Sequence, residues 1–129
     1  MVLRLAAAAA AVLVSVNAVA DQYPSKPVRL VVPFAPGGGN DIAARFVAMR
    51  LTESFGQTAV VDNRAGACST IGTDIVAKSA PDGYTLLVVH NAIAINQTLY
   101  SKLPYDTTRD FAQVALIGTT TNTLVVNPS

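Results

Sequence analysis

The chain has 129 residues, and its nine Lys and Arg residues nearly balance its eight Asp and Glu residues. This near-neutral charge argues against nucleic acid as a partner, because proteins that bind nucleic acid usually present a basic surface. A single cysteine and a single histidine exclude an intramolecular disulfide and a zinc site of the usual Cys/His kind.

The first twenty residues have the pattern of a secretory signal. Residues 1–4 give a short positive start, residues 5–16 are an apolar run with one serine, and residues 18–20 place alanines at the two positions that a signal peptidase reads. The alternative is an apolar helix of the fold, but such a helix should carry a polar face. We therefore predict export to the periplasm and cleavage after Ala20.

The first predicted strand covers residues 28–32, a largely β-branched run between two prolines. A loop over residues 34–39 follows, and Asn40 is predicted to cap a helix whose positive N-terminus suits Asp41. Gly56 is predicted to stop this helix. Three apolar residues recur along it at helical spacing: Ile42, Phe46 and Met49.

The rest of the chain alternates in the same way. Further strands are predicted at residues 58–62, 84–89, 114–118 and 123–126. Further helices are predicted at residues 69–80, capped by Ser69 or Thr70, and at residues 92–100. Strands separated by helices imply crossover connections, which predict an α/β fold with a mostly parallel sheet and flanking helices.

The strongest candidate site is the glycine loop, defined here as residues 34–41. Ligands of an open α/β sheet bind beyond the carboxyl ends of its strands. Three glycines expose backbone amides, and the following helix directs its positive end to the same place, which favours an anion such as a carboxylate. The alternative is a flexible connector. A dinucleotide site is disfavoured, because the fingerprint from Gly37 would need glycine where Ile42 stands, and no Walker motif occurs.

Seven short motifs follow one another along the chain. They are YPSKPVR at 23–29, PFAPGGG at 33–39, DNR at 62–64, GA at 66–67, IG at 71–72, APDGYTL at 80–86 and KLPYD at 102–106. In order and spacing, this set resembles the Bug receptors, the substrate-binding family of tripartite tricarboxylate transporters. The resemblance covers residues 23–129. No single motif is specific, but the ordered set is very hard to obtain by chance.

The resemblance implies a monomeric periplasmic receptor whose two α/β lobes, of the type II periplasmic-binding-protein fold, close on a small carboxylate. The ligand would be a di- or tricarboxylate, an amino acid or an aromatic acid, which the receptor delivers to membrane permease subunits. No cofactor, metal or nucleic acid is expected. The residues that this reading assigns to the ligand site are Phe34, Ala35, Gly37, Gly38, Gly39, Asn40, Asp41, Gly66, Ala67, Ser69, Thr70, His90 and Asn91.

The resemblance also concerns length. Family members continue into a second lobe and later return to complete the first, so residues 21–129 are predicted to be the N-terminal portion of the first lobe. Two alternatives stay open, a truncated product without function and an enzyme with a Rossmann-like domain. The enzyme would need a dinucleotide fingerprint or a converging acid, base and nucleophile, and neither is visible. We therefore predict a binding protein and not an enzyme.

The second predicted site loop departs from the family pattern. Residues 65–69 read Ala-Gly-Ala-Cys-Ser where the family usually has Pro-Gly-Ala-Gly-Gly. The lost proline loosens the turn, and Cys68 is strained if its φ angle must be positive. Cys68 and His90 could suggest a thiol nucleophile and its base, but nothing in the sequence places them together.

Two further expectations concern Arg64 and the tyrosines. Arg64 suits either a ligand carboxylate or a carboxylate of the protein surface. Three tyrosines are expected to pack against the lobe rather than to stack on a substrate: Tyr84, Tyr100 and Tyr105.

Overall fold

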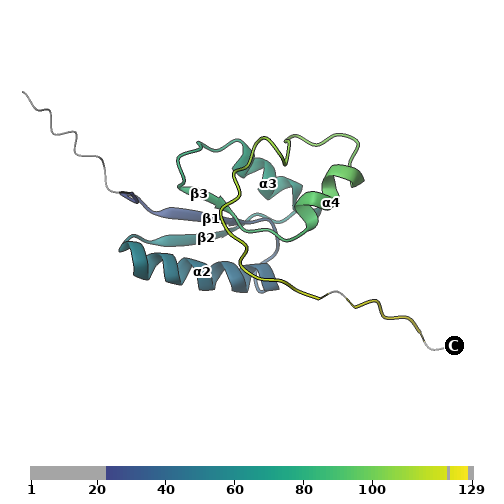
Figure 1. The fold of residues 1–129 in the computed structure, drawn as a ribbon, viewed down its shortest axis with the longest axis horizontal. Coiled ribbons are helices and arrows are strands. Elements are labelled where there is room, and N and C mark those ends of the chain that lie inside the picture. Colours follow the sequence, from purple (N-terminus) through teal and green to yellow (C-terminus); the bar gives the residue numbers. More distant parts are fainter. Residues whose placement is uncertain (1–22, 122, 128–129) are drawn as a thin grey trace, which may run out of the picture.

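The computed structural model describes residues 23–121 and 123–127, so the predicted signal segment and its cleavage site lie outside the described residues. In chain order the elements are β1 (Val28–Val32), α2 (Gly39–Phe55), β2 (Ala59–Asn63), a short 3₁₀ helix η2 (Ala67–Ser69), α3 (Thr70–Ala77), β3 (Thr85–Leu87) and α4 (Ala92–Leu99). Strands and helices alternate, as predicted (Figure 1).

The three strands form one parallel sheet in the order β2-β1-β3. β1 pairs with β2 along its whole length, with Val28 opposite Ala59, and it pairs with β3 where Leu30 lies opposite Leu86. Parallel neighbours need crossover connections, which α2 and α3 supply. The predicted α/β class with a parallel sheet is confirmed.

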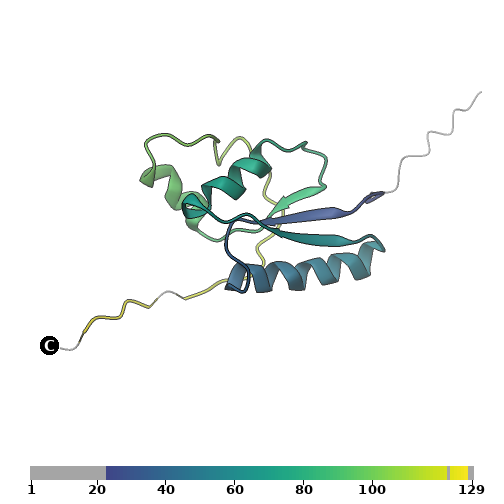
Figure 2. The ribbon, with the colours of Figure 1, turned by 180° about the vertical axis from the view of Figure 1, so that it is seen from behind.

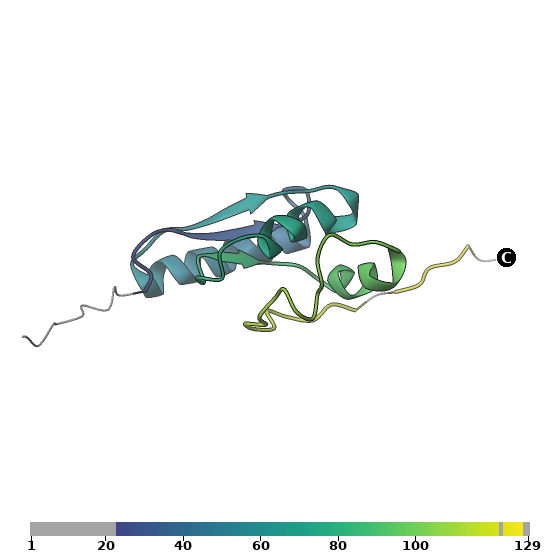
Figure 3. The ribbon, with the colours of Figure 1, turned by 90° about the horizontal axis from the view of Figure 1, so that it is seen from above.

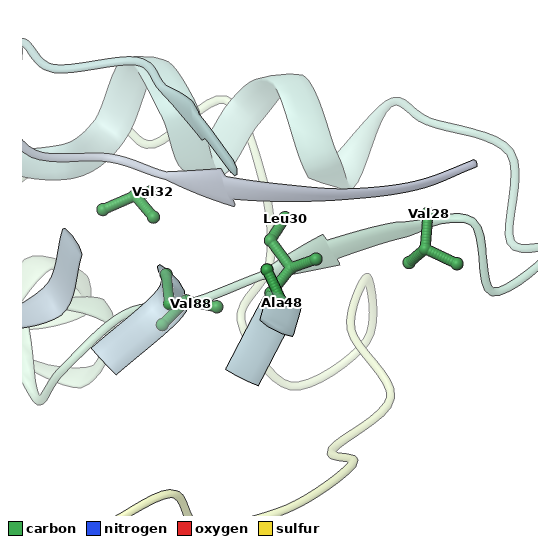
Figure 4. Close-up of a cluster of buried hydrophobic side chains, with 6 residues drawn as sticks. Val28, Leu30, Val32, Ala48 and Val88 are labelled. Atoms are coloured by element: carbon green, nitrogen blue, oxygen red, sulfur yellow. The ribbon is translucent and has the colours of Figure 1, made fainter. Parts of the chain in front are cut away.

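The central strand β1 is covered from both sides, which accounts for its nearly continuous apolar sequence. α2 packs against β1 and β2 on one face of the sheet, and α3 packs against β1 and β3 on the other (Figure 1). Figure 4 shows alternate β1 side chains pointing toward the α2 side of the sheet. The buried cluster on that side comprises Val28, Leu30, Val32, Ala44, Ala48 and Val88.

Helix α2 is present, but no large apolar residue along it is fully buried. The three residues whose spacing predicted the helix are all exposed: Ile42, Phe46 and Met49. The residues that the helix buries are small or polar: Asp41, Ala44 and Ala48. Small side chains let a helix lie close to a sheet, so the spacing predicted the helix and not its orientation. The helix ends as predicted at Gly56, whose φ of 67° is left-handed.

Most other boundaries differ from the prediction by a few residues. β2 begins and ends one residue later than predicted, and α4 ends one residue earlier. α3 ends at Ala77 rather than at residue 80, and β3 is confined to three residues of the predicted 84–89.

The two C-terminal strands predicted at residues 114–118 and 123–126 are wrong. Neither segment is paired with a strand among the described residues, and both are open to solvent, with Val114 81% and Leu124 90% exposed. A β-branched run becomes a strand only where a neighbour supplies hydrogen bonds. This part of the chain instead runs out past the sheet toward the C-terminus (Figures 1 and 3).

Candidate functional site

The glycine loop connects the carboxyl end of β1 to α2 (Figure 2). Gly37 has a φ of 84°, which favours glycine, whereas Gly38 has an extended backbone with a φ of −79°. The helix begins two residues earlier than predicted, because Gly38 and not Asn40 is the N-cap residue. The first helical hydrogen bond runs from the Ile42 amide to Gly38 O at 3.0 Å. The four amides from Gly38 to Asp41 therefore precede the helical ladder, at the positive end of α2.

Asp41 is buried, with 3% of its surface exposed. Its Oδ2 accepts hydrogen bonds from the Gly37 amide and from Arg45 Nε, each at 2.9 Å, and its Oδ1 accepts one from Asn63 Nδ2 at 3.0 Å. Hydrogen bonds from Arg45, Gly37 and Asn63, in that order of importance, lower the pKa of Asp41 from 3.8 to about 2. The carboxylate is therefore negative at neutral pH.

Asn63 links the end of β2 to the glycine loop, although the sequence analysis did not assign it to the site. Its Nδ2 donates to Phe34 O at 3.2 Å as well as to Asp41 Oδ1. It is the last residue of β2 and lies opposite Val32 in the sheet. The signal that could have identified it is an amide side chain directly after a predicted strand, at the edge where ligands bind.

The second loop has a left-handed backbone. Gly66 has a φ of 137°, and the next three residues have φ angles of 44° (Ala67), 49° (Cys68) and 77° (Ser69). The strain predicted at Cys68 is confirmed, since a side chain in this region costs roughly 1–2 kcal/mol. The φ angle of Gly66 favours glycine, and a β-carbon there would lie 2.5 Å from Ile71 Cδ1, so the end of that side chain would have to move.

Hydrogen bonds hold this strained loop in place. Asn96 of α4 is buried, and its Nδ2 donates to Cys68 O at 2.8 Å and to Ser69 Oγ at 3.2 Å. Thr70 Oγ1 donates to Ala67 O at 2.9 Å. Ser69 is the N-cap residue of α3, as one of the two predicted candidates, but its side chain makes no capping hydrogen bond. Nothing in the sequence singles out Asn96, which is one polar residue in a short helix.

The third loop, His90 and Asn91, contacts the glycine loop. The His90 ring stacks on the Phe34 ring, with ring centroids 4.5 Å apart and planes inclined by 26°. His90 Nδ1 accepts a hydrogen bond from the Ala92 amide at 3.0 Å, so in the neutral ring Nε2 carries the proton. Asn91 is the N-cap residue of α4, and both residues of the loop are exposed. The third loop thus lies beside the first, as the resemblance implied.

All three loops lie at the same end of the sheet, beyond the carboxyl ends of its strands, because the strands that precede them are parallel. The Phe34–His90 stack joins the first loop to the third, and Asn63 joins the first loop to the end of β2. Among the glycine-loop residues that were predicted to bind the ligand, Asn40 is half-buried and four are exposed. The exposed four are Ala35, Gly37, Gly38 and Gly39. This end of the sheet therefore exposes backbone groups to solvent, rather than a set of converging charged side chains.

Arg64 and two of the tyrosines have structural partners. Arg64 Nε donates to both carboxylate oxygens of Asp62, at 3.0 and 3.1 Å, which is the surface-carboxylate alternative for this arginine. Tyr84 packs against the core cluster and Tyr105 is buried, so the predicted packing role of these two is confirmed.

Cys68 is exposed and lies beside Tyr100. The neighbouring Cys68 side chain raises the pKa of the Tyr100 phenol. Within residues 23–121 and 123–127, no three His, Cys, Asp or Glu side chains gather as a metal site. The same part of the chain contains no helix with the length and apolarity to cross a membrane.

Comparison with known proteins identifies the relatives of this chain. The profile of a family described as "Tripartite tricarboxylate transporter family receptor" matches residues 43–129. Protein BugT of Bordetella pertussis is 46% identical over 111 residues, which are 84% of this chain and 34% of BugT. The chain thus spans about a third of the length of the curated relatives it matches.

Two solved structures show the same fold. One is the periplasmic binding protein BugD, 43% identical with a TM-score of 0.66, where the match covers 69% of this chain and 30% of BugD. The other is MatC from Rhodopseudomonas palustris with bound malate, 38% identical with a TM-score of 0.70. That match covers 74% of this chain and 33% of MatC.

Proposed function

Because the chain belongs to the tripartite tricarboxylate transporter receptor family, we propose that it forms the first-lobe half of a periplasmic binding site for a small organic carboxylate. In this proposal the ligand carboxylate binds the backbone amides of Gly38, Gly39 and Asn40, directly or through water. The second loop flanks the ligand, and His90 and Asn91 border it from the third. The receptor then delivers its ligand to membrane permease subunits.

The observation that carries the proposal is the row of amides at the start of α2. These amides precede the first helical hydrogen bond, they lie at the positive end of a 17-residue helix, and the glycines that carry them are exposed. A carboxylate is stabilised at such a place by hydrogen bonds and by the helix dipole together. The malate bound to MatC supports this ligand class, because MatC shares the fold at 38% identity.

A hybrid protein tests the proposal. Residues 23–127 of this chain replace the matching third of MatC, and the remaining two-thirds of MatC are kept. Since backbone amides do not depend on side-chain identity, the hybrid is expected to bind malate within about tenfold of the affinity of MatC, measured by calorimetry. A hybrid that unfolds cooperatively and yet binds no malate would contradict the proposal. MatC itself, measured in parallel, is the control.

A further inference from the structure

The glycine loop is anchored to β2 at both of its ends. Asn63 Nδ2 carries two protons, one directed to Phe34 O at the start of the loop and one to Asp41 Oδ1 at its end. Asn63 is itself held in the sheet by its pairing opposite Val32. Asp41 thus connects the loop to a strand of the sheet, and Asp41 itself is buried, which shields its end of these hydrogen bonds from water.

The Gly37 amide is occupied within the protein. It donates to Asp41 Oδ2 at 2.9 Å, whereas the amides that follow it precede the helical ladder. The carboxylate of Asp41 therefore takes the place that a ligand carboxylate could otherwise take at Gly37. Its negative charge would repel an incoming anion, and the Arg45 guanidinium at 2.9 Å offsets that charge.

We propose that Asp41 is a positioning residue, whose carboxylate holds Gly37 and, through Asn63, Phe34, so that the later amides of the glycine loop are in place before a ligand arrives. This inference rests on the proposed function and goes beyond it, because it assigns Asp41 to the loop rather than to the ligand. A loop that is already ordered before the ligand arrives loses less conformational entropy on binding.

Amide hydrogen exchange in the full, ligand-free chain provides the first test. Relative to its intrinsic rate, the Gly37 amide is expected to exchange about tenfold or more slowly than the Gly38 amide, because Gly37 donates to a buried carboxylate. NMR resolves the two amides separately. Equal protection of the two amides overturns the proposal, and this comparison needs no variant.

Asp41→Asn tests the carboxylate itself. The variant keeps the shape of the side chain, but its single carbonyl oxygen lacks the negative charge that strengthens the hydrogen bonds from Gly37 and Arg45, and its NH₂ group opposes the donor of Asn63. The protection of the Gly37 amide is therefore expected to fall. Glu53→Gln is the matched control, because it removes a carboxylate from the same helix, where Glu53 pairs with exposed Arg50 at 3.0 Å. The control is expected to leave Gly37 protected. Loss of protection in both variants, or in neither, overturns the proposal.

The pH dependence of unfolding gives a second readout. The pKa of Asp41 is lowered from 3.8 to about 2, so its contribution to stability is present above about pH 4 and is lost as the pH falls toward 2. The unfolding temperatures of wild type and Asp41→Asn should therefore differ at neutral pH and converge as the pH falls to about 2, whereas the Glu53→Gln difference should stay small throughout. If the unfolding temperatures of wild type and Asp41→Asn differ by the same amount from neutral pH down to about pH 2, the negative charge of Asp41 does not stabilise the fold.

These measurements use no ligand. A hybrid that fails to bind malate would therefore count against the proposed function alone, and an unprotected Gly37 amide would count against the positioning role alone. If Asp41→Asn does not fold, the wild-type exchange comparison still decides the inference.

Discussion

Replacing Gly72 with alanine is expected to lower the free energy of unfolding by about 1–3 kcal/mol. Gly72 lies in the first turn of α3, where a β-carbon would come within 2.8 Å of both Arg64 O and Pro33 Cβ. Neither neighbour can move easily, since one is backbone and the other belongs to a fully buried proline directly after β1. α3 would have to move away from the sheet. Denaturation with urea measures the loss.

Gly39→Ala is the matched control for this variant. Gly39 is also helical, in the first turn of α2, but no heavy atom lies within 4 Å of a β-carbon added there. Alanine is favoured over glycine in helices by up to about 1 kcal/mol, so the control is expected to be neutral or stabilising. Equal losses for Gly39→Ala and Gly72→Ala would contradict the explanation from close packing.

Gly38→Val is expected to weaken malate binding by the hybrid protein, by about 1–3 kcal/mol for each buried hydrogen bond that is lost. The φ of −79° at Gly38 suits any residue, and a β-carbon there meets only Ala35 O, at an ordinary 3.7 Å. Valine therefore fits without backbone strain, but its side chain stands beside the amides that bind the ligand in our proposal. Calorimetry with malate measures the effect.

Gly118→Val is the control for side-chain bulk, because a β-carbon at Gly118 has no neighbour within 4 Å and the residue lies outside the three loops. It is expected to leave malate affinity unchanged. If Gly38→Val also binds malate as the unmodified hybrid does, with its fold intact, the glycine loop is not part of the site.

The sheet could be predicted because each of its strands carries its own signal. β1 is an apolar run between prolines, and β2 and β3 lie within two residues of their predicted positions. The segments at 114–118 and 123–126 carry an equally strong β-pattern, yet they form no strand. Pairing depends on where another segment lies in space, and composition does not contain that information. The orientation of α2 was missed because the residues that it buries fully are small or polar.

The position of the candidate site could be predicted, but its supports could not. A glycine run directly after a strand and before a helix is visible in the sequence. Asn63 and Asn96 act through hydrogen bonds between residues 22 to 29 positions apart, which no local pattern reveals. Asp41 was assigned to the ligand site as the last residue of the glycine loop, which the resemblance implied would hold the carboxylate. The structure supplies that acid with three donors from the protein itself.

An NMR titration of the hybrid protein with malate, in which every backbone amide of residues 23–127 is followed, tests the proposed site most directly. The amide signals of Gly38, Gly39 and Asn40 are expected to shift together and to saturate, with smaller shifts at His90. The Gly37 signal should move little, because its amide stays bonded to Asp41. Saturable shifts confined to other parts of the chain, or none in the glycine loop at high malate concentration, would contradict it.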